Sequence, residues 1–360
     1  MGDARIDGKP VALEAAVAEA ARLLGASRLP VIAGLGTDIA GARAAVALAE
    51  RIGGVVDHTH SGVLLRDLAV MREAGAYVTT PNEARVRGDT LLLVGPGLIE
   101  TWPDLEARLF GKLRAEEGVQ ERRIFWLCPG KGAATKAAIK VIGRNPSELP
   151  TLLAVLRARI AGRPAGTVSK PVAELASALQ AARFGVAVWS AAALDELAIE
   201  MLFGLINDLN AKTRFTGLAL GPGDNARGVL QACGWMTGFP VRTGFGRGFP
   251  EHDPWVFDAA RLVDEGEADC ALWISAYRAS VPGWSASIPT IALSAEGAQP
   301  QAHVYIQVGR PALDHDSVEH DDISGTIVAH AATQVSELPT VAAVVARIAA
   351  ALPNPGPWPC

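Results

Sequence analysis

Short apolar runs rich in β-branched residues alternate with helical patterns along most of this 360-residue chain. The runs at 30–36 and 90–94 have the composition of strands buried on both faces. By contrast, 12–24 and 38–52 show the apolar spacing of helices, and each is followed directly by a glycine that can end it. Strands of this kind pair in parallel when a helix separates them. The alternation therefore predicts an α/β fold of Rossmann-like lobes with mostly parallel sheets.

The chain length favours two lobes, because a single hydrophobic core seldom serves this many residues. A stretch rich in glycine, proline and charge at 157–171 interrupts the alternation and is interpreted as the passage between them. This places a first lobe at 1–160 and a second at 161–352. The tail at 353–360 is too proline-dense for a helix or an inner strand, so we expect it to lie along a surface.

Charge and composition exclude several classes of function. The formal net charge of −5 and the pI near 5.9 give no basic face for nucleic acid. Because no long uncharged apolar run and no signal-peptide pattern occur, we expect a cytoplasmic protein without a membrane partner. Cys128, Cys233, Cys270 and Cys360 are scattered without a Cys-x-x-Cys pair. The chain alone should therefore build neither a disulfide framework nor a zinc or iron–sulfur site.

The segment 234–254, GWMTGFPVRTGFGRGFPEHDP, holds five glycines, three prolines and four aromatic residues. Such a density of glycine and proline suits neither a helix nor a regular strand. Its aromatic side chains carry enough apolar area to favour burial. The segment is therefore predicted to be an ordered irregular loop built around a site.

Two glycine motifs resemble phosphate-binding loops. Gly34-Leu35-Gly36 follows a strand and Asp57 ends the next one, as in a dinucleotide fingerprint, but Ile39 stands where the third glycine belongs. A tight strand-to-helix turn is the favoured interpretation, with NAD binding as the alternative. The segment 130–136 has the residues of a P-loop in the wrong order and is interpreted as a basic surface loop.

Histidines and acids form two further candidate sites. His58 and His60 could share a metal with Asp57, although a hydrogen-bonded strand end is favoured. The acidic run at 314–322 could hold a hard cation, although a solvated loop is favoured. For nucleophilic catalysis there is no Gly-x-Ser-x-Gly elbow, and no base stands beside Cys233 in the sequence.

Four blocks of sequence together resemble the B subunit of formylmethanofuran dehydrogenase, a branch of the molybdopterin oxidoreductases. They are PVIAGLGTDIAGARAAVALAERIGGVVDHTHS at 30–61, TPNEARVRGDTLLLVGPGLIETWP at 80–103, CGWMTGFPVRTGFGRGFPEHDP at 233–254 and ISGT at 323–326. The third block is the most specific. The resemblance implies a molybdopterin-oxidoreductase-like fold.

The chain departs from the redox members of that family at two places. Those members carry an N-terminal cysteine set for a [4Fe–4S] cluster, whereas this chain has no cysteine before Cys128. They also supply a cysteine ligand to tungsten or molybdenum just beyond the strand that matches 54–61. Here Gly62-Val63-Leu64-Leu65-Arg66 follows, and Val or Leu cannot replace a thiolate. The resemblance thus implies a degenerate fold without molybdopterin, cluster or catalytic residues, in which Leu64, Leu65 and Arg66 fill part of the lost cavity.

The family also includes a homologue in the formyltransferase/hydrolase complex of methylotrophic bacteria. As the resemblance implies, that complex moves a formyl group from tetrahydromethanopterin to a methanofuran-type carrier and hydrolyses it to formate. An amidohydrolase-type hydrolase and a formyltransferase do the chemistry, and the homologue that this chain resembles is a non-catalytic scaffold. Asp57, Ser61 and Arg247 are then remnants of the pocket. Of the two loop arginines, Arg242 and Arg247, the second matches the family's arginine and is expected to tie the loop to Asp57 or another carboxylate.

Two alternatives remain open. The chain could be the catalytic subunit of a pterin-dependent dehydrogenase, with His58, His60 or the backbone as metal ligand. It could also be a free-standing nucleotide-binding α/β protein that uses Gly34, Gly36 and Asp57.

Overall fold

The computed structural model describes residues 3–110, 122–130, 139–295 and 302–353. The chain forms two compact units. Unit 1 comprises Met1–Ser61, Gly223–His320 and Ile327–Cys360, and unit 2 comprises Gly62–Pro222 and Asp321–Thr326. The units are not the continuous lobes 1–160 and 161–352 expected from the sequence.

Long-range strand pairing explains this division. The first long strand, β3 (Pro30–Gly36), pairs with β12 (Cys270–Ser275), which lies more than 230 residues further along the chain. The chain therefore leaves unit 1 after Ser61 and returns to it at Gly223. The stretch at 157–171, expected to join the lobes, lies inside unit 2 between two helices.

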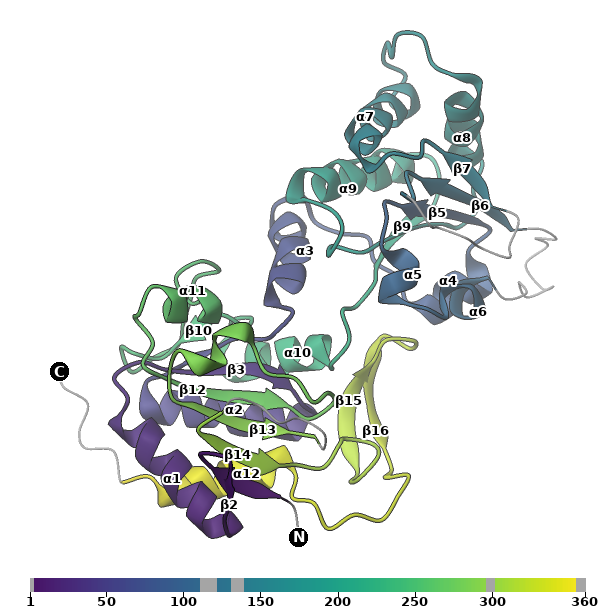
Figure 1. The fold of residues 1–360 in the computed structure, drawn as a ribbon. Helices are drawn as coiled ribbons and strands as arrows, with labels where there is room; N and C mark the ends of the chain where they lie inside the picture. The colour runs from purple at the N-terminus through teal and green to yellow at the C-terminus, as the bar shows by residue number, and fades with distance from the viewer. Residues whose placement is uncertain (1–2, 111–121, 131–138, 296–301, 354–360) are drawn as a thin grey trace. The chain divides into compact units, whose positions relative to one another are not determined.

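Unit 1 is built on a nine-stranded sheet with the order β11-β10-β4-β3-β12-β13-β14-β1-β2 (Figure 1). Its five central strands, β4 to β14 in that order, are parallel, and the two strands at each edge are antiparallel. The remaining strands are β1 (Ala4–Ile6), β2 (Lys9–Pro10), β4 (Val55–Val56), β10 (Thr243–Gly244), β11 (Glu251–His252), β13 (Thr290–Ser294) and β14 (Val304–Gln307). Taken in chain order, the parallel strands run 2-1-3-4-5, the doubly wound arrangement of flavodoxin-like sheets.

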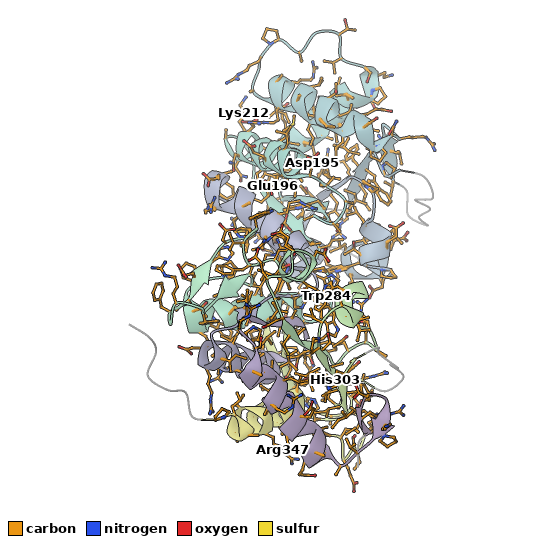
Figure 2. The ribbon with its side chains drawn as sticks, turned by 60° about the vertical axis from the view of Figure 1, so that its left-hand side comes forward. Asp195, Glu196, Lys212, Trp284, His303 and Arg347 are labelled. Carbon is orange, nitrogen blue, oxygen red and sulfur yellow. The ribbon has the colours of Figure 1, made fainter. Side chains whose placement is uncertain are left out.

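Helices cover both faces of this sheet. One core contains side chains from α1 (Leu13–Ala26), α2 (Ile39–Ile52), α10 (Ala226–Thr237) and α12 (Val341–Ala351). The other contains side chains from α11 (Ala259–Asp264) and, packed against it, the 3₁₀ helix η3 (Gly283–Ala286). Because strand side chains alternate, Ile32 enters the first core and Val31 the second. Trp284 of η3, which Figure 2 labels, packs edge-on against Trp273, with 5.8 Å between ring centroids.

The two helices that were expected to end at a glycine, α1 and α2, both begin near the expected residues, but only α2 ends as expected. α2 stops at the left-handed Gly53, as expected. α1 instead continues through Gly25 to Ala26. A Cβ at Gly25 would lie 3.4 Å from the Leu352 side chain, an ordinary van der Waals contact, so this position does not require glycine.

The glycines at 34–36 form a β-bulge, because the register between β3 and β12 shifts between Trp273 and Ser275. Gly34 has a φ of +80°, and a Cβ there would lie 2.6 Å from the Ile274 carbonyl oxygen. The sequence interpretation favoured a tight strand-to-helix turn here, but all three residues lie within β3, and the special backbone belongs to the bulge instead.

Gly34→Ala is therefore expected to lower the free energy of unfolding by about 2 kcal/mol, from backbone strain and a clash in the sheet. Gly8→Ala is the matched control, since Gly8 has a φ of +75° but no atom within 4 Å of an added Cβ. It should lose only the strain contribution, about 1 kcal/mol. Urea unfolding measures both, and equal losses would show that close packing at Gly34 does not matter.

Unit 2 is built on a five-stranded, fully parallel sheet with the order β7-β6-β5-β8-β9. In chain order this is 3-2-1-4-5, the Rossmann order without its sixth strand. The strands are β5 (Thr90–Val94), β6 (Arg123–Leu127), β7 (Lys140–Ile142), β8 (Gly185–Trp189) and β9 (Phe215–Ala219).

Helices cover both faces of this sheet as well. One core contains side chains from α7 (Leu149–Ile160), α8 (Lys170–Gln180) and α9 (Glu196–Asn210), and the other contains side chains from α4 (Pro81–Arg87), α5 (Leu98–Thr101) and α6 (Leu105–Leu109). α3 (Ser61–Ala74) precedes them, and the short 3₁₀ helix η2 (Pro146–Glu148) leads into α7. Asp195, which Figure 2 labels, begins α9 by accepting a hydrogen bond from the Ala198 N–H. Within the described residues, no helix is long and apolar enough to cross a membrane.

The acidic run at 314–322 is mostly strand, not the solvated loop that was favoured. It enters β15 (Ser317–Asp321), which pairs with β16 (Thr326–His330). Several of its carboxylates cap backbone groups: Asp314 accepts from the Arg310 N–H at 2.7 Å, and Asp316 accepts from the Ala332 N–H at 2.8 Å. Asp314 thus caps the segment that precedes β15, and Asp316 ties the start of β15 to the segment that follows β16.

Candidate functional site

In doubly wound sheets, ligands bind outside the carboxyl ends of the strands, where the strand order reverses. In unit 1 this point falls between β3 and β12. The segments that follow β3, β4 and β12 carry polar side chains there, including Asp57 and His58 after β4 and Arg278 after β12. This edge is therefore where a functional site is expected.

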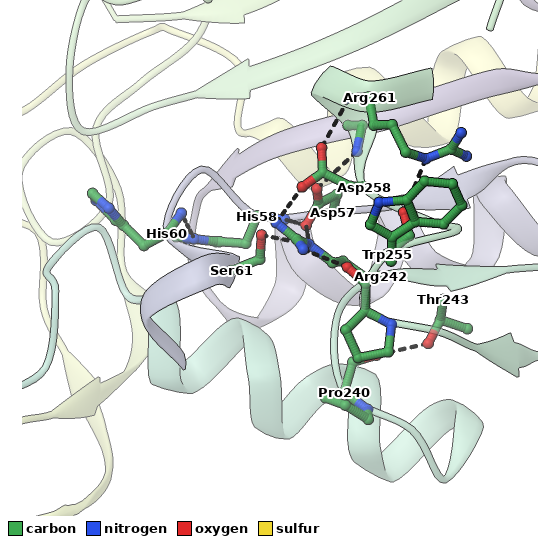
Figure 3. A network of polar contacts seen from close by, with 12 residues as sticks. Asp57, His58, His60, Ser61, Pro240, Arg242, Thr243, Trp255, Asp258 and Arg261 are labelled. Atoms are coloured by element: carbon green, nitrogen blue, oxygen red, sulfur yellow. Dashed lines mark hydrogen bonds and ion pairs between the residues drawn. The ribbon is translucent and has the colours of Figure 1, made fainter. Parts of the chain in front are cut away.

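Arg242 is the centre of a buried polar network at this edge (Figure 3). Its Nε lies 3.1 Å from the Ser61 hydroxyl and 3.6 Å from the Asp57 carboxylate. Its other nitrogens pair with the Asp258 carboxylate and donate to the Pro254 carbonyl. Arg242 has a φ of +63°, unusual for a residue with a side chain. The contacts of its guanidinium stabilise this strained backbone.

Both carboxylate oxygens of Asp57 accept hydrogen bonds from backbone N–H groups. One carboxylate oxygen accepts from the His58 N–H at 2.8 Å, and the other accepts from the Ala259 N–H at 3.0 Å. Burial raises the pKa of Asp57 to about 6, opposed by the Ala259 N–H and by Arg242. The carboxylate is thus ionised at neutral pH and paired with Arg242. Its oxygens are engaged by these groups rather than turned toward the 2′-hydroxyl of a ribose.

His58 and His60 form a second group beside this network. Burial and the neighbouring His60 lower the pKa of His58 to about 3, so its imidazole is neutral. Its Nδ1 accepts from the His60 N–H at 2.9 Å, and its Nε2 then carries the proton, 3.4 Å from the Asp224 carbonyl. Both ring nitrogens of His58 are therefore occupied, which leaves no lone pair for a metal.

His60 faces an acid instead of a metal partner. Its Nε2 lies 3.4 Å from the Asp224 carboxylate, which also accepts from Arg278 at 2.8 Å. Burial would raise the pKa of Asp224, but the contacts with His60 and Arg278 outweigh it and hold that pKa below its usual value. Across the described residues, no group of three or more His, Cys, Asp or Glu could hold a metal ion.

The segment 234–254 differs from its prediction in two ways. Its first residues, Gly234 to Thr237, form the last turn of helix α10. Of its four aromatic residues only Phe245 is buried, whereas Trp235, Phe239 and Phe249 are exposed. The aromatic side chains of the loop therefore do not enclose a site. The loop instead places Arg242 in the polar network with Asp57.

The structure brings together Asp57 and Ser61 but places Arg247 elsewhere. Arg247 is exposed, pairs with Glu251 at 2.9 Å and lies over the Phe249 ring. The arginine that reaches Asp57 is Arg242. Asp258, which begins α11 by accepting from the Arg261 N–H, is a member of the network that the sequence interpretation missed. An acid just before a helix is a recognisable N-cap signal, but nothing in the sequence indicates its pairing with Arg242.

The remaining candidates make no hydrogen bond or ion pair with this network in the part of the chain that the structure describes. Leu64 and Leu65 are buried in α3, and the Arg66 guanidinium there donates to the carbonyls of Ala191 and Leu194 within unit 2. Burial raises the pKa of the Cys233 thiol to about 12, so it is not a nucleophile at neutral pH. Most of the segment 130–136 lies outside the described residues.

The fold and the site thus define a doubly wound α/β protein. At the carboxyl ends of its strands, where ligands bind in such sheets, side chains of the chain itself are hydrogen-bonded to one another. No protein-family model matches the chain. The B subunit of the formyltransferase/hydrolase complex Fhc of Methylorubrum extorquens is 37% identical over 352 residues, which cover 95% of this chain and 96% of that protein. The chain therefore belongs to the family of this Fhc protein.

A solved structure and two further relatives are similar to the chain as well. The crystal structure of the formyltransferase/hydrolase complex (FhcABCD) from Methylorubrum extorquens with methylofuran matches with a TM-score of 0.88 and 37% identity, covering 96% of this chain and 97% of that one. The B subunit of the tungsten-containing formylmethanofuran dehydrogenase 2 of Methanocaldococcus jannaschii is 28% identical over 77% of this chain and 66% of that protein. Its counterpart in Methanococcus maripaludis is 26% identical over 73% and 64%. The family resemblance inferred from the sequence is confirmed.

Proposed function

We propose that this chain is a non-catalytic scaffold subunit of a formyltransferase/hydrolase complex. The observation that carries the proposal is its near full-length similarity to the Fhc B subunit in sequence and in structure. The complex would convert formyl-tetrahydromethanopterin to formate through a methanofuran-type carrier, in one-carbon oxidation. The partners would be an amidohydrolase-type hydrolase, a formyltransferase and further subunits.

The fold would be a degenerate form of the molybdopterin-oxidoreductase fold. The residues present do not fit a tungsten- or molybdenum-pterin group: Leu64 and Leu65 follow the strand where the family supplies a thiolate, and both are buried. His58, the nearest alternative ligand, uses both ring nitrogens in hydrogen bonds. A soft metal selects sulfur ligands, so these observations support a chain without its own metal, pterin or cluster.

The buried network supports a structural role for the edge of the sheet. A site for substrate or cofactor needs polar groups left available to the ligand. Here Asp57 is held by Arg242 and two backbone N–H groups, and Arg242 is held by Asp258, Ser61 and Pro254. The network joins β4, β10 and α11 and so fixes the loop.

Affinity purification of the tagged full-length chain from its source cells tests the proposal. The hydrolase and formyltransferase chains should copurify in fixed ratio, and the assembly should release formate from formyl-tetrahydromethanopterin without an electron acceptor. Elemental analysis should find neither tungsten nor molybdenum at stoichiometric level. Purification of the chain by itself, or viologen reduction by the assembly, would contradict the proposal.

A further inference from the structure

A short extended segment lies beside β9, the last strand of the unit 2 sheet on that side. The Gly217 N–H donates to the Tyr77 carbonyl at 2.7 Å, and the Thr79 N–H donates to the Gly217 carbonyl at 3.0 Å. These two bonds form a parallel bridge between Val78 and Gly217. The segment that contains Val78 is therefore the outer edge of the sheet at this point.

The backbone groups of Val78 face away from β9. In a parallel bridge the residue opposite the bonded one directs its own N–H and C=O to the other side, as Val78 does opposite Gly217. Neither group hydrogen-bonds to another residue in the part of the chain that the structure describes. Unpaired backbone groups at a sheet edge are a template on which another extended chain can pair.

The neighbouring edge of β9 is closed by a side chain. The Asn210 amide donates to the Phe215 carbonyl at 2.6 Å and accepts from the Phe215 N–H at 3.2 Å. The same amide donates to the Ile206 carbonyl at 2.8 Å, which holds it against the end of α9. The backbone pair that is open on this side of the sheet is therefore that of Val78, not that of Phe215.

The side chains around Val78 form one surface. Tyr77 and Val78 are 54 and 61% exposed, and both line a hollow of about 850 Å³. Lys212, which Figure 2 labels, and Arg214 line the same hollow. Tyrosine and arginine are residue types that are enriched in protein interfaces. The open backbone edge thus lies beside exposed apolar area and two cations.

The charge of this hollow indicates the kind of partner. Lys212 and Arg214 are the charged residues among the eight that line it, and none of the eight is acidic. Neither cation forms an ion pair with an acid among the described residues. The acid nearest to them in the sequence, Asp208, is paired with Arg157 at 3.0 Å. Electrostatic complementarity therefore favours an acidic partner.

We propose that an extended, acidic segment of another subunit adds to the unit 2 sheet beside Val78. The segment pairs its backbone with the N–H and C=O of Val78 and places its carboxylates against Lys212 and Arg214. In strand addition of this kind, main-chain hydrogen bonds give affinity and the neighbouring side chains give specificity. This inference rests on the proposed function, because it requires that the chain has partner subunits.

Hydrogen–deuterium exchange, read at single residues in the purified complex and in the isolated full-length chain, tests the edge. The Val78 amide should exchange at least about tenfold more slowly in the complex, because it gains a hydrogen bond there. The Thr79 amide already bonds to Gly217 and should be protected in both samples. If the complex assembles and the Val78 amide exchanges as fast as in the isolated chain, the proposal is wrong while the proposed function stands.

Two variants of Val78 separate the backbone from the side chain. Val78→Pro removes the outward N–H but leaves the bonds of Tyr77 and Thr79 to Gly217 in place. It should lower the recovery of partner subunits by about tenfold, because a backbone acceptor of the partner is left unpaired. Val78→Ala keeps the N–H and should retain most of the recovery. Circular dichroism of each isolated chain checks folding, and equal recovery with the two variants would contradict strand addition.

Charge reversal tests the acidic character of the partner. Lys212→Glu combined with Arg214→Glu should weaken recovery by at least about tenfold, because like charges then face each other. Lys170→Glu combined with Arg163→Glu is the control: it makes the same charge change at exposed residues of unit 2 outside the hollow and should change nothing. Equal recovery with both pairs would refute an acidic partner. If the wild-type chain dimerises and Val78→Pro is monomeric, the edge binds a second copy and the proposal is overturned.

Discussion

Arg242→Ala is expected to lower the free energy of unfolding by about 3 kcal/mol, because it leaves the buried Asp57 and the half-buried Asp258 without their cation. Arg242 pairs with both Asp57 and Asp258, and its side chain is only 17% exposed. The strained backbone at this residue would lose the contacts that stabilise it as well. Urea unfolding followed by far-UV circular dichroism measures the loss.

Arg247→Ala is the matched control from the same loop. Arg247 also pairs with an acid, Glu251, but its side chain is 71% exposed. Exposed ion pairs contribute little, so the loss should stay below about 1 kcal/mol. Turnover of a complex containing Arg247→Ala should be unchanged. Similar losses for the two arginines would refute the assignment of Arg242 as the buried anchor.

His58→Asn should remove a large pH dependence from the stability of the chain. The pKa of His58 is depressed to about 3 in the folded state, so its contribution is complete above the unfolded value of 6.5. As pH falls below 6.5 the unfolded chain binds a proton that the folded chain excludes. Relative to the variant, the wild type should lose about 3 kcal/mol between pH 7 and pH 4.

The Asn side chain suits this comparison because its oxygen can accept from the His60 N–H as Nδ1 does. Asp57 acts with the opposite sign, since its raised pKa of about 6 makes stability fall as pH rises from about 4 to 6. It is present in both proteins, so the difference between them isolates His58. Parallel stability profiles for wild type and variant would show that the imidazole is not held neutral by burial.

The sequence predicted the parallel α/β class because the buried strands are long and apolar. β3 and β5, for example, are continuous hydrophobic runs bounded by polar or glycine-containing turns. The division into units was not predictable in the same way, since it depends on β3 pairing with a strand from the far end of the chain. β10 and β11 contain two residues each and give no periodic signal.

The candidate site was predicted only in part, because some of its residues come from an irregular loop far along the chain. Asp57 and Ser61 lie together because both follow the end of β4, and both contact Arg242. Arg242 and Arg247 are five residues apart in an irregular loop, where spacing does not indicate which side chain points inward. The pairing of Thr243 with Val56 fixes the loop on β4 and turns Arg242 toward Asp57. The exposed aromatic residues were mispredicted because apolar area favours burial equally well against a partner or a core.

Native mass spectrometry of the complex purified from its source cells tests the central claim most directly. We predict that this chain, released from the assembly, has the mass of its polypeptide alone, and that the assembly contains the hydrolase and formyltransferase chains. A released chain that carries the added mass of a pterin and a tungsten or molybdenum ion would contradict the account.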